Sequence, residues 1–153
     1  MRIYFDTSAM LKRPFAERES SAFNDFFTLM VSDGHACATS VLTRVETARA
    51  IRRHLDAGGP PTMSTDQTLE DVIVAPISQD TVRMAETIGP PNLRSLDAIH
   101  LATAIVVGAQ AVVTYDERLR WAAFDAGMLV IQPDGDGTLP DGWGWLPGSD
   151  VTD

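Results

Sequence analysis

Two acidic residues follow apolar runs, at positions where a carboxylate could take part in chemistry. Asp6 comes directly after Ile3-Tyr4-Phe5, and Asp116 comes directly after the run AVVTY at 111–115. Both runs are typical of buried strands, and in an open α/β sheet the sites form at the carboxyl ends of the strands. We therefore expect the two carboxylates to be neighbours in space. Asp is also a favourable helix N-cap, and a helical pattern follows each residue, so a purely structural capping role stays open.

Two further acidic residues lie on helical patterns. Asp97 falls in the first turn of the apolar segment 96–108, where the helix dipole favours an anion by about 0.3–1 kcal/mol. Glu46 lies on or beside a predicted apolar stripe. The stripe consists of Leu42, Val45, Ala48 and Ile51. One interpretation of Glu46 is a surface ion pair with Arg49 or Arg53. If Glu46 instead faces the sheet, its burial requires a cation or a hydrogen-bond partner.

The elements that would position these acids alternate along the chain. Strand patterns occupy 2–5, 36–39, 72–77, 111–115 and 129–132. Helical patterns occupy 7–12, 17–31, 40–58, 69–72, 80–88, 96–108 and 116–127, with Ser40 and Ser95 as candidate caps. This alternation predicts an α/β fold with a central parallel sheet flanked by helices on both faces.

Composition indicates a globular body and a different tail. The chain has 153 residues, 44% of them hydrophobic and 22% charged, which is ordinary for one globular domain. Residues 133–153 are rich in Gly, Pro and Asp and contain no Lys or Arg. We therefore expect a domain over 1–132 and an irregular acidic tail over 133–153, whose Trp143 and Trp145 pack on the body or on a partner.

Other features limit the classes of function. No apolar run is long enough to span a bilayer and no signal peptide is evident, so we expect no membrane association. The single cysteine, Cys37, cannot form an intrachain disulfide, which favours the cytoplasm. The formal net charge of −9 argues against a nucleic-acid partner, unless bound cations reverse the local charge. No zinc-type His/Cys spacing and no Gly-rich phosphate loop are present.

Four motifs resemble one family. FDTSAMLK, VETARA, SLDAIHLATA and VVTYDERL, in this order, resemble the PIN-domain ribonucleases, in particular the VapC-type toxins of bacterial toxin–antitoxin pairs. The resemblance runs from about Arg2 to Gln132. It implies a PIN-like fold and a catalytic set, which is carried over to Asp6, Glu46, Asp97 and Asp116. It also assigns supporting positions to Thr7, Ser8 and Thr114.

The chemistry expected of this set is metal-dependent hydrolysis of RNA phosphodiester bonds. Clustered carboxylates repel one another unless they share a cation, and oxygen ligands suit Mg²⁺ or Mn²⁺. Asp6 and Asp97 would bind the metal directly, and Asp116 would complete its ligands or hold a ligand water. Glu46 would orient or deprotonate the attacking water. His100, three residues after Asp97, is expected to be a satisfied core or rim residue, with a role near the metal left open.

The resemblance also implies partners: a cognate antitoxin, an RNA substrate and a second copy of the chain. Lys12, Arg13, Arg49 and Arg53 are candidate RNA contacts, although each is equally consistent with a solvated helix face. The aromatic face of segment 17–31 is either a contact for the antitoxin or the dimer, or part of the core. This face consists of Phe23, Phe26, Phe27 and Met30. The alternative function is a catalytically inactive PIN-like module that retains metal and partner binding.

Overall fold

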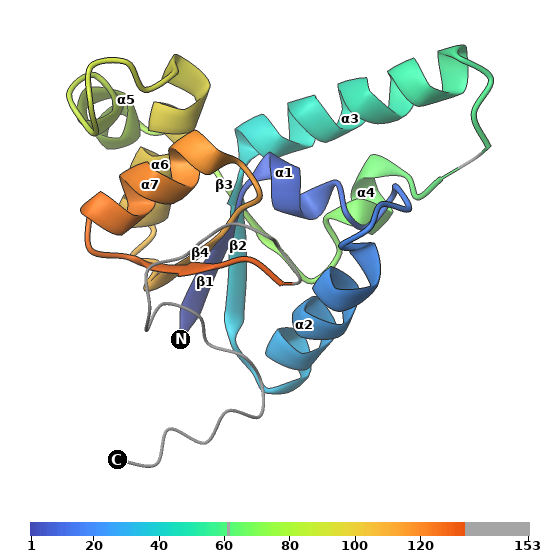
Figure 1. Ribbon diagram of the computed structural model, residues 1–153. Helices are drawn as coiled ribbons and strands as arrows, with labels where there is room; N and C mark the ends of the chain where they lie inside the picture. Colours follow the sequence, from blue (N-terminus) through green and yellow to red (C-terminus); the bar gives the residue numbers. More distant parts are fainter. Residues whose placement is uncertain (61, 134–153) are drawn as a thin grey trace.

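The centre of the protein is one parallel sheet. In the computed structural model, which describes residues 1–60 and 62–133, five strands pair in the order β3-β2-β1-β4-β5, every neighbouring pair being parallel (Figure 1). The strands are β1 (Arg2–Phe5), β2 (Ala36–Ser40), β3 (Ile73–Ala75), β4 (Ala111–Val113) and β5 (Leu129–Ile131). The predicted α/β class with a central parallel sheet is confirmed.

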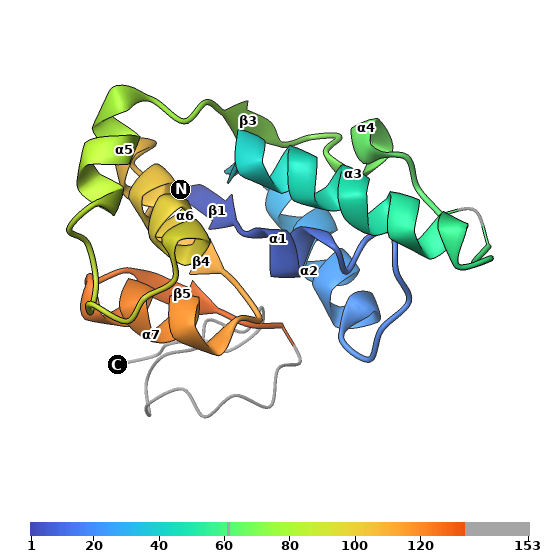
Figure 2. The ribbon, with the colours of Figure 1, turned by 90° about the horizontal axis from the view of Figure 1, so that it is seen from above.

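Seven helices connect and cover the strands. They are α1 (Thr7–Met10), α2 (Ser20–Ser32), α3 (Val41–Asp56), α4 (Thr65–Thr68), α5 (Gln79–Ala85), α6 (Ser95–Val106) and α7 (Glu117–Asp125). Figure 2 shows α3 beside β3, α4 beside α3, and α7 beside β5 at the other edge of the sheet. The short helix predicted at 69–72 lies instead at α4, because Ser64 and Gln67 form a capping box that starts the helix earlier.

The sheet is buried on both faces. Alternate residues of β1 point to opposite sides: Ile3 and Phe5 join a core with α2, whereas Tyr4 joins a core with α6 and α7. The predicted cover of helices on both faces is therefore confirmed. The aromatic face of α2 belongs to the first core: Phe23, Phe26, Phe27 and Met30 are at most 4% exposed. The alternative that this face contacts a partner is wrong, because its own fold buries it.

Two local predictions are also wrong. The buried side of α3 carries Thr43, Thr47 and Ile51, whereas Val45 is 53% exposed. Hydroxyl hydrogen bonds decide this rotation, since Thr43 receives bonds from Thr39 at 2.9 Å and from Thr7 at 3.1 Å. Ser95 is the first residue of α6 and not its cap; Arg94 holds the N-cap position without a side-chain hydrogen bond.

Candidate active site

The two strand-end acids lie side by side and cap helices. β1 and β4 are adjacent parallel strands, so their carboxyl ends share one edge of the sheet. Asp6 Oδ1 accepts a hydrogen bond from the Ala9 backbone N–H at 2.9 Å, and Asp116 Oδ1 accepts one from Leu119 at 2.9 Å. Both residues therefore have the structural role that the sequence left open, and this role places both carboxylates at the same edge.

All four predicted acids line one cavity of about 390 Å³. Asp6 and Asp116 come from the strand ends, Asp97 from the first turn of α6, and Glu46 from the second turn of α3. Thr7 and Ser8 also line it, together with Leu11, Arg94, Ser95, Leu96 and His100. Thr114 is not among the lining residues but contacts two of the acids: its Oγ1 donates to Asp6 Oδ2 at 2.7 Å and accepts from the Asp116 backbone N–H at 3.0 Å. The fold thus gathers four carboxylates that are far apart in the sequence.

Asp6 is buried and fixed from several sides. Ser8 Oγ donates to both carboxylate oxygens, at 2.7 and 2.9 Å, and Thr114 Oγ1 donates to Oδ2 at 2.7 Å. Burial raises the pKa of Asp6 above its usual value, although His100 and the hydrogen bonds oppose that shift. Ser8 and Thr114 therefore hold the position of a carboxylate that the interior disfavours as an anion.

The Asp97 side chain is fixed by fewer hydrogen bonds than that of Asp6. Its Oδ2 is buried and has no hydrogen-bond partner among the described residues. Burial raises the pKa of Asp97, and Asp116 and Asp6 raise it further by repulsion. An unpartnered carboxylate oxygen facing two more carboxylates is an arrangement that a cation would stabilise.

The donor set fits a hard divalent cation. Carboxylate oxygens are the ligands that Mg²⁺ and Mn²⁺ prefer. Asp97 Oδ2, which has no hydrogen-bond partner among the described residues, is available as such a ligand atom. Within residues 1–60 and 62–133, no three His, Cys, Asp or Glu side chains are already arranged as a ligand set. Side-chain movement would bring Asp6, Asp97 and Asp116 onto one ion, and their roles as ligands stay a prediction.

Glu46 belongs to a buried hydrogen-bonded network. Its Oε1 accepts from Thr7 Oγ1 at 2.8 Å and lies 3.1 Å from Nε2 of His100. Burial raises the pKa of Glu46, but the bonds from His100 and Thr7 outweigh it, so the pKa lies below its usual value. The predicted ion pair with Arg49 or Arg53 is wrong. His100 is buried and satisfied, as expected, and it also lines the cavity; its spacing from Asp97 was the signal for this.

Two of the candidate RNA contacts, Lys12 and Arg13, have charged groups that contact other residues of the fold. The Lys12 ammonium pairs with Glu17 and with Glu19. The Arg13 guanidinium donates to the carbonyls of Thr68, at 2.7 Å, and Glu70, at 3.1 Å. Both charged groups are engaged within the fold, and their contact with RNA stays a prediction. Arg49 and Arg53 are exposed on α3, so their contact with RNA stays a prediction.

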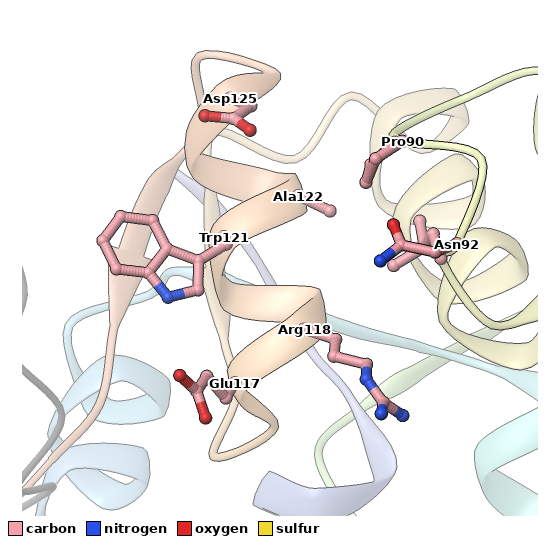
Figure 3. A pocket seen from close by; sticks show the side chains of 8 residues that line it. Pro90, Asn92, Glu117, Arg118, Trp121, Ala122 and Asp125 are labelled. Carbon is pink, nitrogen blue, oxygen red and sulfur yellow. The ribbon is translucent and has the colours of Figure 1, made fainter.

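A second cavity of about 360 Å³ lies beside α7. Figure 3 shows Arg118 on the side of α7 that faces Pro90 and Asn92. Glu117 and Trp121 lie on another side of the helix. The lining residues Leu93 and Glu117 are direct sequence neighbours of Arg94 and Asp116, which line the acid cavity. An arginine lines each cavity: Arg94 lines the acid cavity, and Arg118 lines the cavity beside α7. Sequence reasoning missed both Arg94 and Arg118.

Comparison with known proteins places this arrangement in a family. The PIN domain family model matches residues 3–125. Ribonuclease VapC47 of Mycobacterium tuberculosis (strain CDC 1551 / Oshkosh) is 38% identical over 133 residues, which cover 86% of this chain and 96% of that protein. Ribonuclease VapC35 of the same organism is 38% identical over 135 residues, with the same coverage.

Solved structures agree in fold. VapBC2 of Rickettsia felis, solved bound to a DNA fragment from its promoter, is one of them: the match covers 88% of this chain and 100% of the matched chain, at a TM-score of 0.62 and 11% identity. The sarcin–ricin-loop-cleaving toxin VapC20 of M. tuberculosis matches 82% of this chain and 95% of its own, at a TM-score of 0.57 and 18% identity. The sequence matches and the shared fold together show that this chain belongs to the PIN domain family, among its VapC ribonucleases.

Proposed function

We propose that this protein is a Mg²⁺- or Mn²⁺-dependent endoribonuclease that acts as the toxin of a toxin–antitoxin pair. The observation that carries the proposal is the convergence of Asp6, Glu46, Asp97 and Asp116 on one cavity at the carboxyl edge of the sheet. Family membership among the VapC ribonucleases supports the endoribonuclease activity. A metal requirement is supported by the raised pKa of Asp97 and by its unpartnered oxygen.

Each acid has a distinct part in this proposal. Asp6, Asp97 and Asp116 would hold the metal, with Ser8 and Thr114 fixing Asp6. A metal bound there would lower the pKa of a ligand water and stabilise charge on the phosphodiester. Glu46, whose low pKa keeps it a carboxylate, would accept the proton of the attacking water.

The RNA strand would run from the acid cavity toward the cavity beside α7, because an arginine lines each of them. Arg94 at the rim of the acid cavity and Arg118 in the second cavity would contact phosphates on either side of the scissile bond. Binding weakens with salt, and the slope of log affinity against log salt is therefore negative. Removing one phosphate contact decreases the magnitude of this slope by about 0.7–0.9. We expect this decrease for Arg118→Gln, measured by RNA binding to the Asp97→Asn protein, and no decrease for Arg83→Gln on distant α5. Equal slopes for both variants would contradict the proposed path.

Further partners belong to the same proposal. A cognate antitoxin is supported by the VapBC2 complex among the structural neighbours, which contains both partners of such a pair. A homodimer and a cytoplasmic location are inferred from the resemblance and from the single cysteine. No helix in the described ranges is long and apolar enough to cross a membrane. Light scattering of the purified protein, with and without antitoxin, measures the assembly directly.

The deciding experiment is incubation of purified total RNA with the antitoxin-free protein. We expect discrete cuts with Mg²⁺ or Mn²⁺ and none with EDTA or with Asp116→Asn. Glu117→Gln is the matched control, because this exposed acid is adjacent in sequence but lines the other cavity. Cuts that persist in Asp116→Asn would contradict the assignment. Metal binding by the folded protein without any cuts would support the inactive binding module instead.

A further inference from the structure

His100 is a buried titratable residue that the proposed chemistry does not use. Its ring is 4% exposed and lies on α6, between β1 and α3. Nδ1 lies 2.7 Å from the Tyr4 hydroxyl, and Nε2 lies 3.1 Å from Glu46 Oε1. A single imidazole therefore connects the core of the sheet to a carboxylate of the acid cavity.

The chemistry of these partners fixes where the protons lie. Glu46 has a pKa below its usual value, so it is an ionised carboxylate that can only accept hydrogen bonds. Nε2 must therefore carry a proton and donate it to Oε1. Burial raises the pKa of Tyr4, so its hydroxyl stays protonated and can donate to an unprotonated Nδ1. The neutral Nε2–H tautomer satisfies all three side chains.

In this network the two carboxylate oxygens of Glu46 differ in the hydrogen bonds that they accept. Oε1 accepts from both Thr7 and His100, whereas Oε2 accepts no hydrogen bond from the part of the chain that the structure describes. Glu46 also lines the acid cavity. We propose that His100, itself oriented by Tyr4, is a positioning residue that holds Glu46 by Oε1 and so presents Oε2 to the attacking water. The inference rests on the proposed function and names a residue of the same site.

Amide substitutions test the geometry, because Gln places an N–H near the position of Nε2 whereas Asn places one near Nδ1. In single-turnover RNA cleavage we expect His100→Ala and His100→Asn to be at least about tenfold slower than wild type. His100→Gln should recover most of that loss. Tyr4→Phe should cause a smaller decrease, since it removes the group that orients the ring. If the Gln variant is as slow as the Ala variant while both melt cooperatively, the inference is wrong.

A double-mutant cycle separates positioning from general stability. In the Glu46→Gln background, His100→Ala should change the residual rate by less than about twofold. The same tenfold loss in both backgrounds would assign His100 a purely structural role. Long-range ¹H–¹⁵N NMR of the imidazole gives an independent readout: we expect the Nε2–H tautomer, and Nδ1–H would overturn the inference. A wild-type protein that cuts no RNA refutes the proposed function, whereas the NMR result still decides the arrangement.

Discussion

The acid cavity has a strand half, which contains Asp6, and a helix half, which contains Asp97, and the two halves hold their carboxylates differently. On the strand side, Asp6 is 3% exposed and accepts hydrogen bonds from Ser8, Thr114 and the Ala9 backbone. On the helix side, Asp97 neither caps a helix nor receives a hydrogen bond at its buried Oδ2 from any described residue. The pKa of each carboxylate is raised, Asp6 by burial alone and Asp97 by burial and by repulsion from Asp116 and Asp6.

The difference shows how one site can combine order with adaptability. The strand half is fixed because its acid also builds the fold, through the cap and the buried hydroxyls. Asp97 has no such structural role, which supports the proposal that its carboxylate is available as a ligand. In that proposal the strand half would set the position of the metal, and Asp97 would complete its ligands.

The largest expected effect is on cleavage, where the two halves should behave alike. If both acids bind the metal, Asp6→Asn and Asp97→Asn should each slow RNA cleavage by roughly 10³-fold, equivalent to about 4 kcal/mol. Initial rates on a fixed RNA substrate measure this, with Glu117→Gln as the control that stays near wild type. A fully active Asp97→Asn protein would leave the strand half as the entire site.

The next effect is metal-dependent stability. Mg²⁺ or Mn²⁺ at about 100 times its Kd should raise the free energy of unfolding of the wild-type protein by about 2.7 kcal/mol. Urea denaturation with metal and with EDTA measures the difference. We expect Asp97→Asn to abolish most of it, since this acid supplies the unpartnered donor. Equal stabilisation of both proteins would mean that the ion binds without the helix half.

Without metal, the two halves should differ in stability. Asp6→Ala removes a helix cap and leaves the Ser8 and Thr114 hydroxyls without their acceptor, which should cost about 1–2 kcal/mol. Asp97→Ala removes only a repelled carboxylate, so its free energy of unfolding should equal or exceed that of wild type. Urea denaturation in EDTA at pH 7 compares them. A larger loss in Asp97→Ala would reverse the assignment of the two halves.

The smallest effect is a pH dependence. A carboxyl whose pKa is raised by folding binds more protons in the folded than in the unfolded state, so its contribution to stability falls as pH rises through the window between the two values. Metal-free Asp97→Asn should therefore exceed wild type in stability at neutral pH, and the excess should vanish as pH falls below that window. Asp6 titrates in both proteins, and the loss of its repulsion with Asp97 adds to the excess stability of the variant at neutral pH. An excess that grows on acidification would contradict the raised pKa of Asp97.

Sequence reasoning succeeded where local rules decide. Strand-end position and helix spacing made the four acids candidates, each with a structural alternative, and the family resemblance joined them into one set. The alternation of patterns predicted the parallel sheet with helices on both faces. It failed on α3, because the hydroxyls of Thr43 and Thr47, and not the apolar residues Val45 and Ala48, face the body. Hydrophobic periodicity cannot anticipate a helix face that buries threonines, of which Thr43 is hydrogen-bonded to Thr7 and Thr39.

The charged side chains show the same limit. Lys12 and Arg13 follow the Asp6 motif in sequence, yet their charges pair with Glu17 and Glu19 or with backbone carbonyls of distant residues. The expectation for the tail, including its domain boundary at 133, falls on residues 134–153, outside the described part of the chain. That expectation stays a prediction.

In the sequence, two strand ends and a first helical turn made Asp6, Asp116 and Asp97 candidates, and the family resemblance joined them with Glu46 in one catalytic set. Only the tertiary structure decided how they differ, since burial, repulsion and hydrogen-bond partners depend on residues that are distant in the chain. Asp6 meets Thr114 across 108 positions, and Glu46 meets His100 across 54. These long-range contacts, which no local pattern encodes, fix Asp6 and Glu46, whereas Asp97 Oδ2 has no hydrogen-bond partner among the described residues.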